Sequence, residues 1–182
     1  MRFSENRLIA WIVLAVVVLL SISLYGGGAM KEMRFSVQQI FTDGAQKDGL
    51  SINRDLDARA DKAAILVSIA GKYLPSDSAA LADVKEAADL LTNSAELSDR
   101  NDANTKLTRA VETLYTELEQ QNLSETDKTN INAAYREIKS RADTISRDTY
   151  NAVAREFNQS ISRFPANIIS GFTGVDELPL FE

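Results

Sequence analysis

The chain has 182 residues, a formal net charge of −6, and neither cysteine nor histidine. It is long enough for one domain with a hydrophobic core plus an appendage. The missing residue types exclude a disulfide framework, a zinc site built on cysteines, a thiol nucleophile and the commonest general base. The net negative charge gives no indication of the basic surface that a nucleic-acid-binding protein needs. Only three prolines interrupt a composition that favours an all-helical domain.

A long apolar run follows the short basic N-terminus of residues 1–7. Residues 8–25 read LIAWIVLAVVVLLSISLY, eighteen residues without a charge, which is just enough to span the hydrocarbon core of a bilayer. Trp11 and Tyr25 fall near the ends of the run, where aromatic side chains suit the membrane interface. We expect a transmembrane anchor. The alternative is a cleaved signal peptide, although the run exceeds the usual apolar region of about 7–15 residues.

The segment after the run is predicted to be a flexible or weakly structured linker over residues 26–52. Gly26, Gly27 and Gly28 favour a break in the helix. Turn signals follow at Asp43-Gly44 and Asp48-Gly49.

Residues 53–164 are expected to form an antiparallel bundle of three to four long helices. Apolar residues of the first helix recur at three- and four-residue steps: Leu56, Ala60, Ala63, Leu66, Ala70 and Tyr73. Pro75 ends this helix, and Ser76 or Asp77 is expected to cap the next. That helix carries Leu81, Val84, Ala88, Leu91 and Ala95. After a polar loop over residues 98–102, a third helix carries Leu107, Val111, Leu114 and Leu118.

The fourth helix is predicted to be the longest element of the bundle. Ser124 is a good N-cap, and acidic residues occupy the first turn. A heptad seam follows along Ile131, Tyr135, Ile138, Ala142, Ile145, Thr149 and Ala152. Near Tyr150 the apolar stripe shifts by one residue. From Glu125 to Arg163 the helix would measure about 58 Å. Residues 165–182 are expected to form an irregular tail.

An aromatic residue followed by an asparagine occurs twice near the end of this helix, seven residues apart. We predict a contact patch or structural motif here, formed by Tyr150, Asn151, Phe157, Asn158, Phe164, Pro165 and Phe172. In the structural interpretation, the asparagines fix the register of a seam or bond free carbonyls at a helix end. In the functional interpretation, the aromatic side chains dock a partner protein. The sequence leaves both open.

No catalytic constellation accompanies this motif. The chain lacks a P-loop, a dinucleotide fingerprint and a GxSxG elbow. Asp57 and Asp61 share a helix face that is expected to be solvated. Ser68 and Lys72 form a pair of a kind that any helical protein contains. We therefore expect no enzyme, no cofactor and no metal site.

Two stretches carry a family resemblance. The first is Leu56-Asp57-Ala58-Arg59-Ala60-Asp61, followed by Leu66-Val67 and Tyr73. The second contains Arg147, Tyr150-Asn151, Val153, Phe157-Asn158, Ile161, Phe164-Pro165, Ile168-Ile169 and Phe172. Together they resemble the LemA family of bacterial proteins. The resemblance implies one N-terminal transmembrane helix and an antiparallel long-helix bundle, and it implies no catalytic residues.

The expected function is that of a scaffold or adaptor at the bacterial cell envelope. Residues 8–25 would hold it as a single-pass protein in the cytoplasmic (inner) membrane, with the side of the soluble domain left open by nearly balanced flanking charges. Its partner would be a protein, and self-association along the seam is a further route. The alternatives are an accessory subunit of a membrane-associated enzyme, or a ligand or lipid sensor with a cavity between helices.

Overall fold

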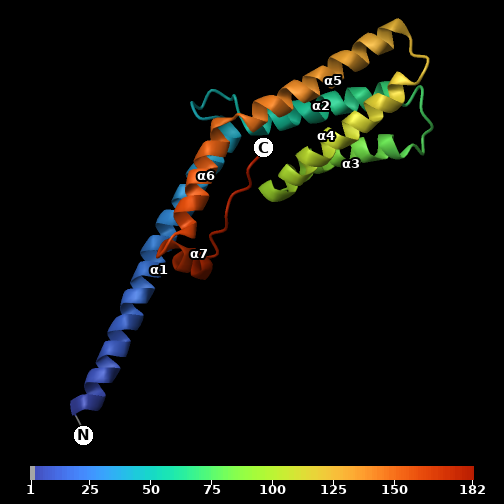
Figure 1. Ribbon diagram of the computed structural model, residues 1–182. Coiled ribbons are helices and arrows are strands. Elements are labelled where there is room, and N and C mark those ends of the chain that lie inside the picture. Colours follow the sequence, from blue (N-terminus) through green and yellow to red (C-terminus); the bar gives the residue numbers. More distant parts are fainter. Residues whose placement is uncertain (1–2) are drawn as a thin grey trace. The chain divides into compact units, whose positions relative to one another are not determined.

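The computed structural model describes the backbone of residues 3–182. It does not describe the side chains of residues 3–6, 8, 19, 20 and 22–24. This part of the chain contains seven helices and no strand, which confirms the all-helical prediction. The helices are α1 (Phe3–Asp43), α2 (Ile52–Ala70), α3 (Ala79–Asn93), α4 (Leu97–Glu119), α5 (Glu125–Ser146), α6 (Thr149–Ser162) and α7 (Ala166–Thr173), as labelled in Figure 1.

The chain divides into two compact units. The terminal unit comprises the chain up to Gln38 together with Arg155–Leu178, and the bundle unit comprises Gln39–Ala154 together with Pro179–Glu182. The sequence predicted one bundle over residues 53–164. The division falls within α6 instead, and the last four residues join the bundle unit rather than an irregular tail of their own.

The bundle unit is an antiparallel arrangement of α2 to α5. α2 packs against both α3 and α5, and α3 packs against α4, with successive helices alternating in direction (Figure 1). Nine of its large aliphatic side chains are fully buried: Ile52, Leu56, Leu66, Leu91, Leu107, Leu114, Leu118, Ile131 and Ile138. Burying each such side chain stabilises the fold by roughly 1.5–3 kcal/mol. The helical bundle expected from the three- and four-residue spacing is therefore present.

Serine side chains start three of these helices. Ser51, Ser78 and Ser124 each accept a hydrogen bond from the backbone N–H three residues later, which satisfies one of the free donors of the first turn. The predicted cap at Ser124 is present. The cap of α3 is Ser78, one or two residues later than the sequence indicated.

Helices continue through two places where the sequence predicted an interruption. α1 runs through Gly26, Gly27 and Gly28 to Asp43, where a break and a linker over residues 26–52 were expected. Glycine inside a helix costs only about 1 kcal/mol relative to alanine, which packing on another helix offsets. The expected polar loop over residues 98–102 lies inside α4, because Arg100 is buried there and its side chain bonds the carbonyl of Leu91 at 2.8 Å.

The predicted fourth helix is two helices. α5 ends at Ser146 and α6 begins at Thr149. The Asp148 carboxylate accepts a hydrogen bond from the N–H of Tyr150 at 2.8 Å, and such local bonds favour a helix start over a helix interior. Within the predicted irregular tail, residues 166–173 form α7, which ends at Gly174 with a left-handed φ of 64°.

Within the described part of the chain, no helix is both long enough and apolar enough to cross a membrane. Six positions of the expected anchor, residues 8, 19, 20 and 22–24, lie outside the described side chains. The anchor over residues 8–25 stays a prediction.

Candidate functional site

Asn151 holds the last residues of the chain against the bundle unit. Its Oδ1 accepts a hydrogen bond from the N–H of Phe181 at 2.8 Å, and its Nδ2 donates to the carbonyl of the same residue at 3.0 Å. Nδ2 also donates to the carbonyl of Ile145 at 2.8 Å, at the end of α5. The side chain is 3% exposed. One amide therefore satisfies three backbone groups that would otherwise be buried without partners.

Asn158 repeats this arrangement within the terminal unit. Its Oδ1 accepts from the N–H of Leu178 at 2.8 Å, and its Nδ2 donates to the carbonyl of Leu178 at 2.8 Å. Leu178 is buried at 2% exposure. Both asparagines thus pair with the N–H and the C=O of a single tail residue, as a neighbouring strand would do.

The spacing of the two asparagines matches the spacing of their partners. Seven residues of α-helix advance about 10.5 Å, and three residues of extended chain advance about 10 Å. Asn151 and Asn158 lie seven residues apart in α6, and Phe181 and Leu178 lie three residues apart in the tail, paired in reverse order. The repeat noted in the sequence is therefore the register of a segment that runs antiparallel to its helix.

Aromatic side chains pack around the first asparagine. Tyr150 is fully buried, and its hydroxyl donates to the carbonyl of Pro179 at 3.0 Å. Its ring meets Phe41 edge-on, with centroids 5.5 Å apart, and Phe181 at 6.0 Å. Phe41 and Phe181 are 5.2 Å apart. Such pairs contribute about 0.5–1.5 kcal/mol beyond their burial.

The seven motif residues fall into two groups. Tyr150, Asn151 and Phe157 are buried and Asn158 is half-buried, which is what the structural interpretation of the motif predicts for these four residues. Phe164 and Phe172 are 80% and 81% exposed, and Pro165 is exposed as well. These last three residues are accessible to a partner or a surface.

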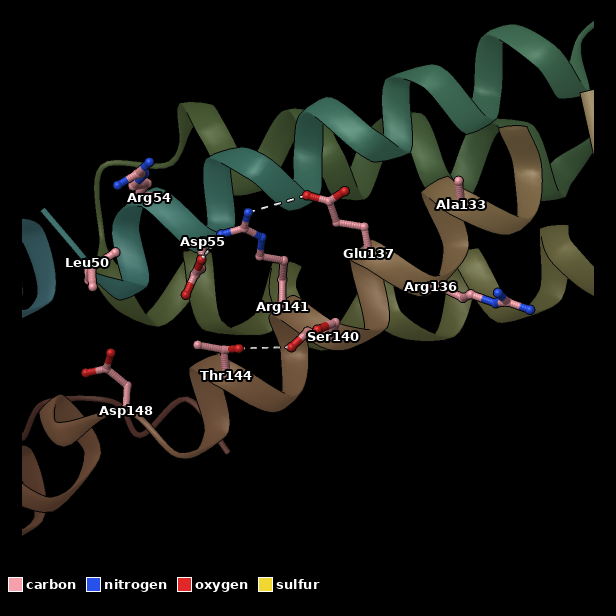
Figure 2. A pocket seen from close by; sticks show the side chains of 10 residues that line it. All are labelled: Leu50, Arg54, Asp55, Ala133, Arg136, Glu137, Ser140, Arg141, Thr144 and Asp148. Atoms are coloured by element: carbon pink, nitrogen blue, oxygen red, sulfur yellow. Dashed lines mark hydrogen bonds and ion pairs between the residues drawn. The ribbon is translucent and has the colours of Figure 1, made fainter. Parts of the chain in front are cut away.

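A separate cleft opens in the bundle unit between α2 and α5, with a volume of about 600 Å³. Its lining consists of Leu50, Arg54, Asp55, Ala133, Arg136, Glu137, Ser140, Arg141, Thr144 and Asp148. Figure 2 shows Arg141 lying between two carboxylates. Its guanidinium is 2.5 Å from Asp55 and 3.4 Å from Glu137. Lys62 reaches Glu137 at 3.3 Å.

The pKa values of two side chains in this cleft, Glu137 and Arg141, are shifted in favour of their charged forms. Hydrogen bonds from Lys62 and then Arg141 lower the pKa of Glu137, and the hydrogen bond with Asp55 raises the pKa of Arg141. Both groups are therefore held in their charged forms, and neither is poised for proton transfer near neutral pH. Asp148 differs, because burial and then the charge of Asp55 raise its pKa.

Three arginines and three carboxylates line the cleft, so their formal charges cancel. Among the described residues there is no group of three or more metal-ligating side chains. The cleft therefore presents balanced positive and negative charges rather than an excess of one charge.

Two buried arginines were not singled out in the sequence as functional or structural residues. Arg59 is fully buried in α2 and donates to the Asn104 side chain and, at 2.8 Å, to the Thr108 hydroxyl. Burial lowers its pKa to about 10, and its Nε has no hydrogen-bond partner. Arg100 donates to the Asn53 side chain at 2.5 Å and lies 5.4 Å from the centre of the Phe41 ring.

A signal for Arg59 is present in the sequence. The residue stands three positions after Leu56 and four before Ala63, which is a core position of the three- and four-residue pattern. An arginine at such a position must be paired by polar groups of a neighbouring helix, here α4.

A model of the LemA family matches residues 50–182. The chain belongs to the LemA family. The match begins just before α2 and includes the buried Arg59, both asparagines and the tail that they bind. Neither a curated protein nor a solved structure matches the chain.

Proposed function

We propose that this LemA protein is a membrane-anchored scaffold that binds a protein partner through the cleft between α2 and α5 at the bacterial cell envelope. The observation that carries the binding role is the cleft itself, which is open and lined by equal numbers of positive and negative side chains. Surfaces that pair complementary charges across a partly apolar contact are typical of transient protein interfaces. Because charged side chains of the cleft are paired with one another, the cleft is better suited to binding a partner than to catalysis.

The proposed anchor is supported by the exposed face of α1. Between residues 9 and 18, eight large apolar side chains are 46–70% exposed: Ile9, Trp11, Ile12, Val13, Leu14, Val16, Val17 and Val18. Soluble monomers rarely expose a continuous apolar surface of this kind, because each such side chain gains roughly 1.5–3 kcal/mol when it leaves water. A lipid environment provides that burial for a run of eighteen uncharged residues.

A ligand sensor is the second candidate. A volume of about 600 Å³ lies within the range of small-ligand sites. The lining argues for the scaffold, because six of its ten residues are charged and only Leu50 and Ala133 are apolar. Small-ligand pockets are usually lined by apolar and aromatic side chains.

The binding role is tested by photo-crosslinking in bacterial cells. A benzophenone amino acid replaces Ala133, which is exposed at the cleft, or Glu86, which is exposed on α3. We expect a discrete adduct with another protein from position 133 and not from position 86, and a lower yield after Arg136→Ala. Equal labelling at both positions, or none at 133, would exclude the cleft as the binding surface. An adduct between two copies of this chain would show that the cleft mediates self-association and does not bind a different protein.

The anchor is tested by alkaline carbonate extraction of the same cells. The wild-type chain is expected to stay in the membrane pellet, and the double variant Leu14→Asp, Val17→Asp is expected to move to the supernatant. Release of the wild-type chain would refute membrane anchoring.

A further inference from the structure

Within the terminal unit, α7 packs against α1 at two adjacent glycines. A Cβ atom added to Gly26 would lie 3.2 Å from Ile169, and one added to Gly27 would lie 2.4 Å from the Thr173 methyl group. Contacts below 3 Å essentially never occur at real Cβ atoms. A Cβ added to Gly28 would meet nothing within 4 Å. The close approach of α7 therefore depends on the absence of a side chain at position 27.

A neighbouring face of α7, about a quarter-turn round the helix from Ile169 and Thr173, is apolar and exposed. Ile168 and Phe172 are 47% and 81% exposed, and Phe164, one turn earlier in sequence, is 80% exposed. Their four-residue spacing places Ile168 and Phe172 on one face of the helix. The helix itself, ANIISGFT, contains no charged residue. Its inward face is formed by Ile169, which is only 8% exposed, and Thr173.

The position of this contact along α1 indicates which kind of surface the exposed face of α7 meets. Gly26 directly follows Tyr25, the last residue of the apolar run over residues 8–25, so α7 meets α1 within about one helical turn of the end of that run. Eighteen residues advance about 27 Å, close to the thickness of the hydrocarbon core, so this end coincides with the headgroup region.

We propose that α7 is an interfacial helix whose side chains Ile168 and Phe172, together with Phe164 just before the helix, insert into the boundary between lipid headgroups and acyl chains beside the anchor. The inference rests on the proposed membrane anchor and adds a second lipid contact to it. A lipid surface fits better than a protein, because the exposed face continues an apolar run that already requires lipid and α7 itself carries no charge to select a partner. Tyr25 is 83% exposed at the same level, as interfacial aromatic residues are.

The single tryptophan of the chain makes the proposal testable by fluorescence. The full chain is reconstituted into protein-free phosphatidylcholine–phosphatidylglycerol vesicles that contain lipids brominated near the headgroup or deep in the acyl chain. Wild type carries its tryptophan in the anchor, W11F/F172W carries it on α7, and W11F/I65W carries it on α2 of the bundle unit, where Ile65 is 45% exposed.

We expect shallow bromines to lower the emission of W11F/F172W at least twofold and deep bromines to lower it less, while W11F/I65W stays unquenched. If bromines quench Trp11 but not W11F/F172W, α7 is not interfacial and the anchor stands. If neither Trp11 nor W11F/F172W is quenched, the proposed anchor fails and the inference fails with it.

A matched pair of glycine variants tests how α7 is positioned. Gly27→Ala and Gly28→Ala add the same methyl group and the same helix propensity to α1, and only the first collides with Thr173. In the W11F/F172W chain, we expect Gly27→Ala to remove at least half of the shallow quenching and Gly28→Ala to leave it unchanged. Equal quenching in both variants would overturn the role assigned to the glycine contact.

Discussion

Replacing Asn151 by alanine tests how the tail is held. The substitution removes three hydrogen bonds of 2.8–3.0 Å, two to Phe181 and one to Ile145. Each such bond contributes about 1 kcal/mol net, so we expect Asn151→Ala to lower the free energy of unfolding by about 3 kcal/mol. The cost rises if the buried backbone groups stay without water, because an unsatisfied buried group costs about 1–3 kcal/mol.

Deleting residues 179–182 separates the tail bonds from the helix-end bond. In the truncated chain the bond to Ile145 remains, together with a longer one of 3.4 Å to the carbonyl of Ser146, so Asn151→Ala should cost about 1 kcal/mol there. The two changes are therefore coupled by about 2 kcal/mol in a double-mutant cycle. The truncation itself costs more than two bonds, because it also removes the fully buried Phe181.

The assay is urea unfolding of the four full-length and truncated chains in mild detergent, followed by far-UV circular dichroism. With a slope of about 2 kcal/mol per molar urea, Asn151→Ala should lower the midpoint by about 1.5 M in the complete chain. Asn130→Ala, at an exposed position of α5, is the matched control and should change stability by less than about 0.5 kcal/mol. The reasoning is refuted if Asn151→Ala costs the same with and without the tail.

Three further changes probe buried and paired charges, each by urea unfolding. A hydrogen bond from Tyr73 is the main cause that lowers the pKa of Asp127, so this bond stabilises the fold above the ordinary carboxyl pKa and is lost as the pH falls. The cost of Asp127→Asn should therefore shrink below about pH 4, and a constant cost would contradict the assignment. Burial raises the pKa of Asp148, which makes its charged form destabilising at neutral pH. Asp148→Asn should stabilise the protein at pH 7 and lose that gain below the ordinary carboxyl pKa, whereas the exposed control Asp143→Asn should give no gain. Arg59→Ala should cost about 3–5 kcal/mol, because it leaves a cavity between α2 and α4 and polar groups without partners; a cost below 1 kcal/mol would show that the site collapses.

Local periodicity predicted that the bundle helices exist and which large apolar residues they bury, but not where all of them begin and end. In α4, Leu107, Val111, Leu114 and Leu118 were placed on one face by their four- and three-residue steps, and all four are buried. In α3 the same reasoning was correct for Leu81, Val84 and Leu91. It was wrong for Ala95, which is exposed beyond the end of the helix, because alanine fits surface and core equally well.

The division of the predicted fourth helix left a trace in the sequence. The apolar stripe shifts by one residue near Tyr150, which was interpreted as a change of register within one continuous helix. The structure shows that the shift marks the gap between α5 and α6, where Asp148 bonds the N–H of Tyr150. A shift of the stripe together with an Asp, two residues before the first buried position, is a recognisable signature of a new helix start.

The contacts of the tail had no local signal. Phe181 is separated from Asn151 by thirty residues, and neither helix propensity nor periodicity contains information about a partner at that distance. For the same reason Gly26 and Gly27 were interpreted as helix breakers. Their role depends on Ile169 and Thr173, more than 140 residues further along the chain, and this packing offsets the intrinsic cost of glycine in a helix.

The chemistry of the tail contacts explains why asparagine occupies both positions. Residues after Gly174 belong to no helix or strand, so the buried N–H and C=O groups of Leu178 and Phe181 need partners from side chains. A primary amide presents one donor and one acceptor in a plane and pairs with both groups at once. A carboxylate would place its charge against the carbonyl oxygen, and a hydroxyl carries its donor and acceptor on a single oxygen rather than side by side in a plane. The repeated asparagine is therefore what allows a segment without secondary structure to bring Phe181 into the core.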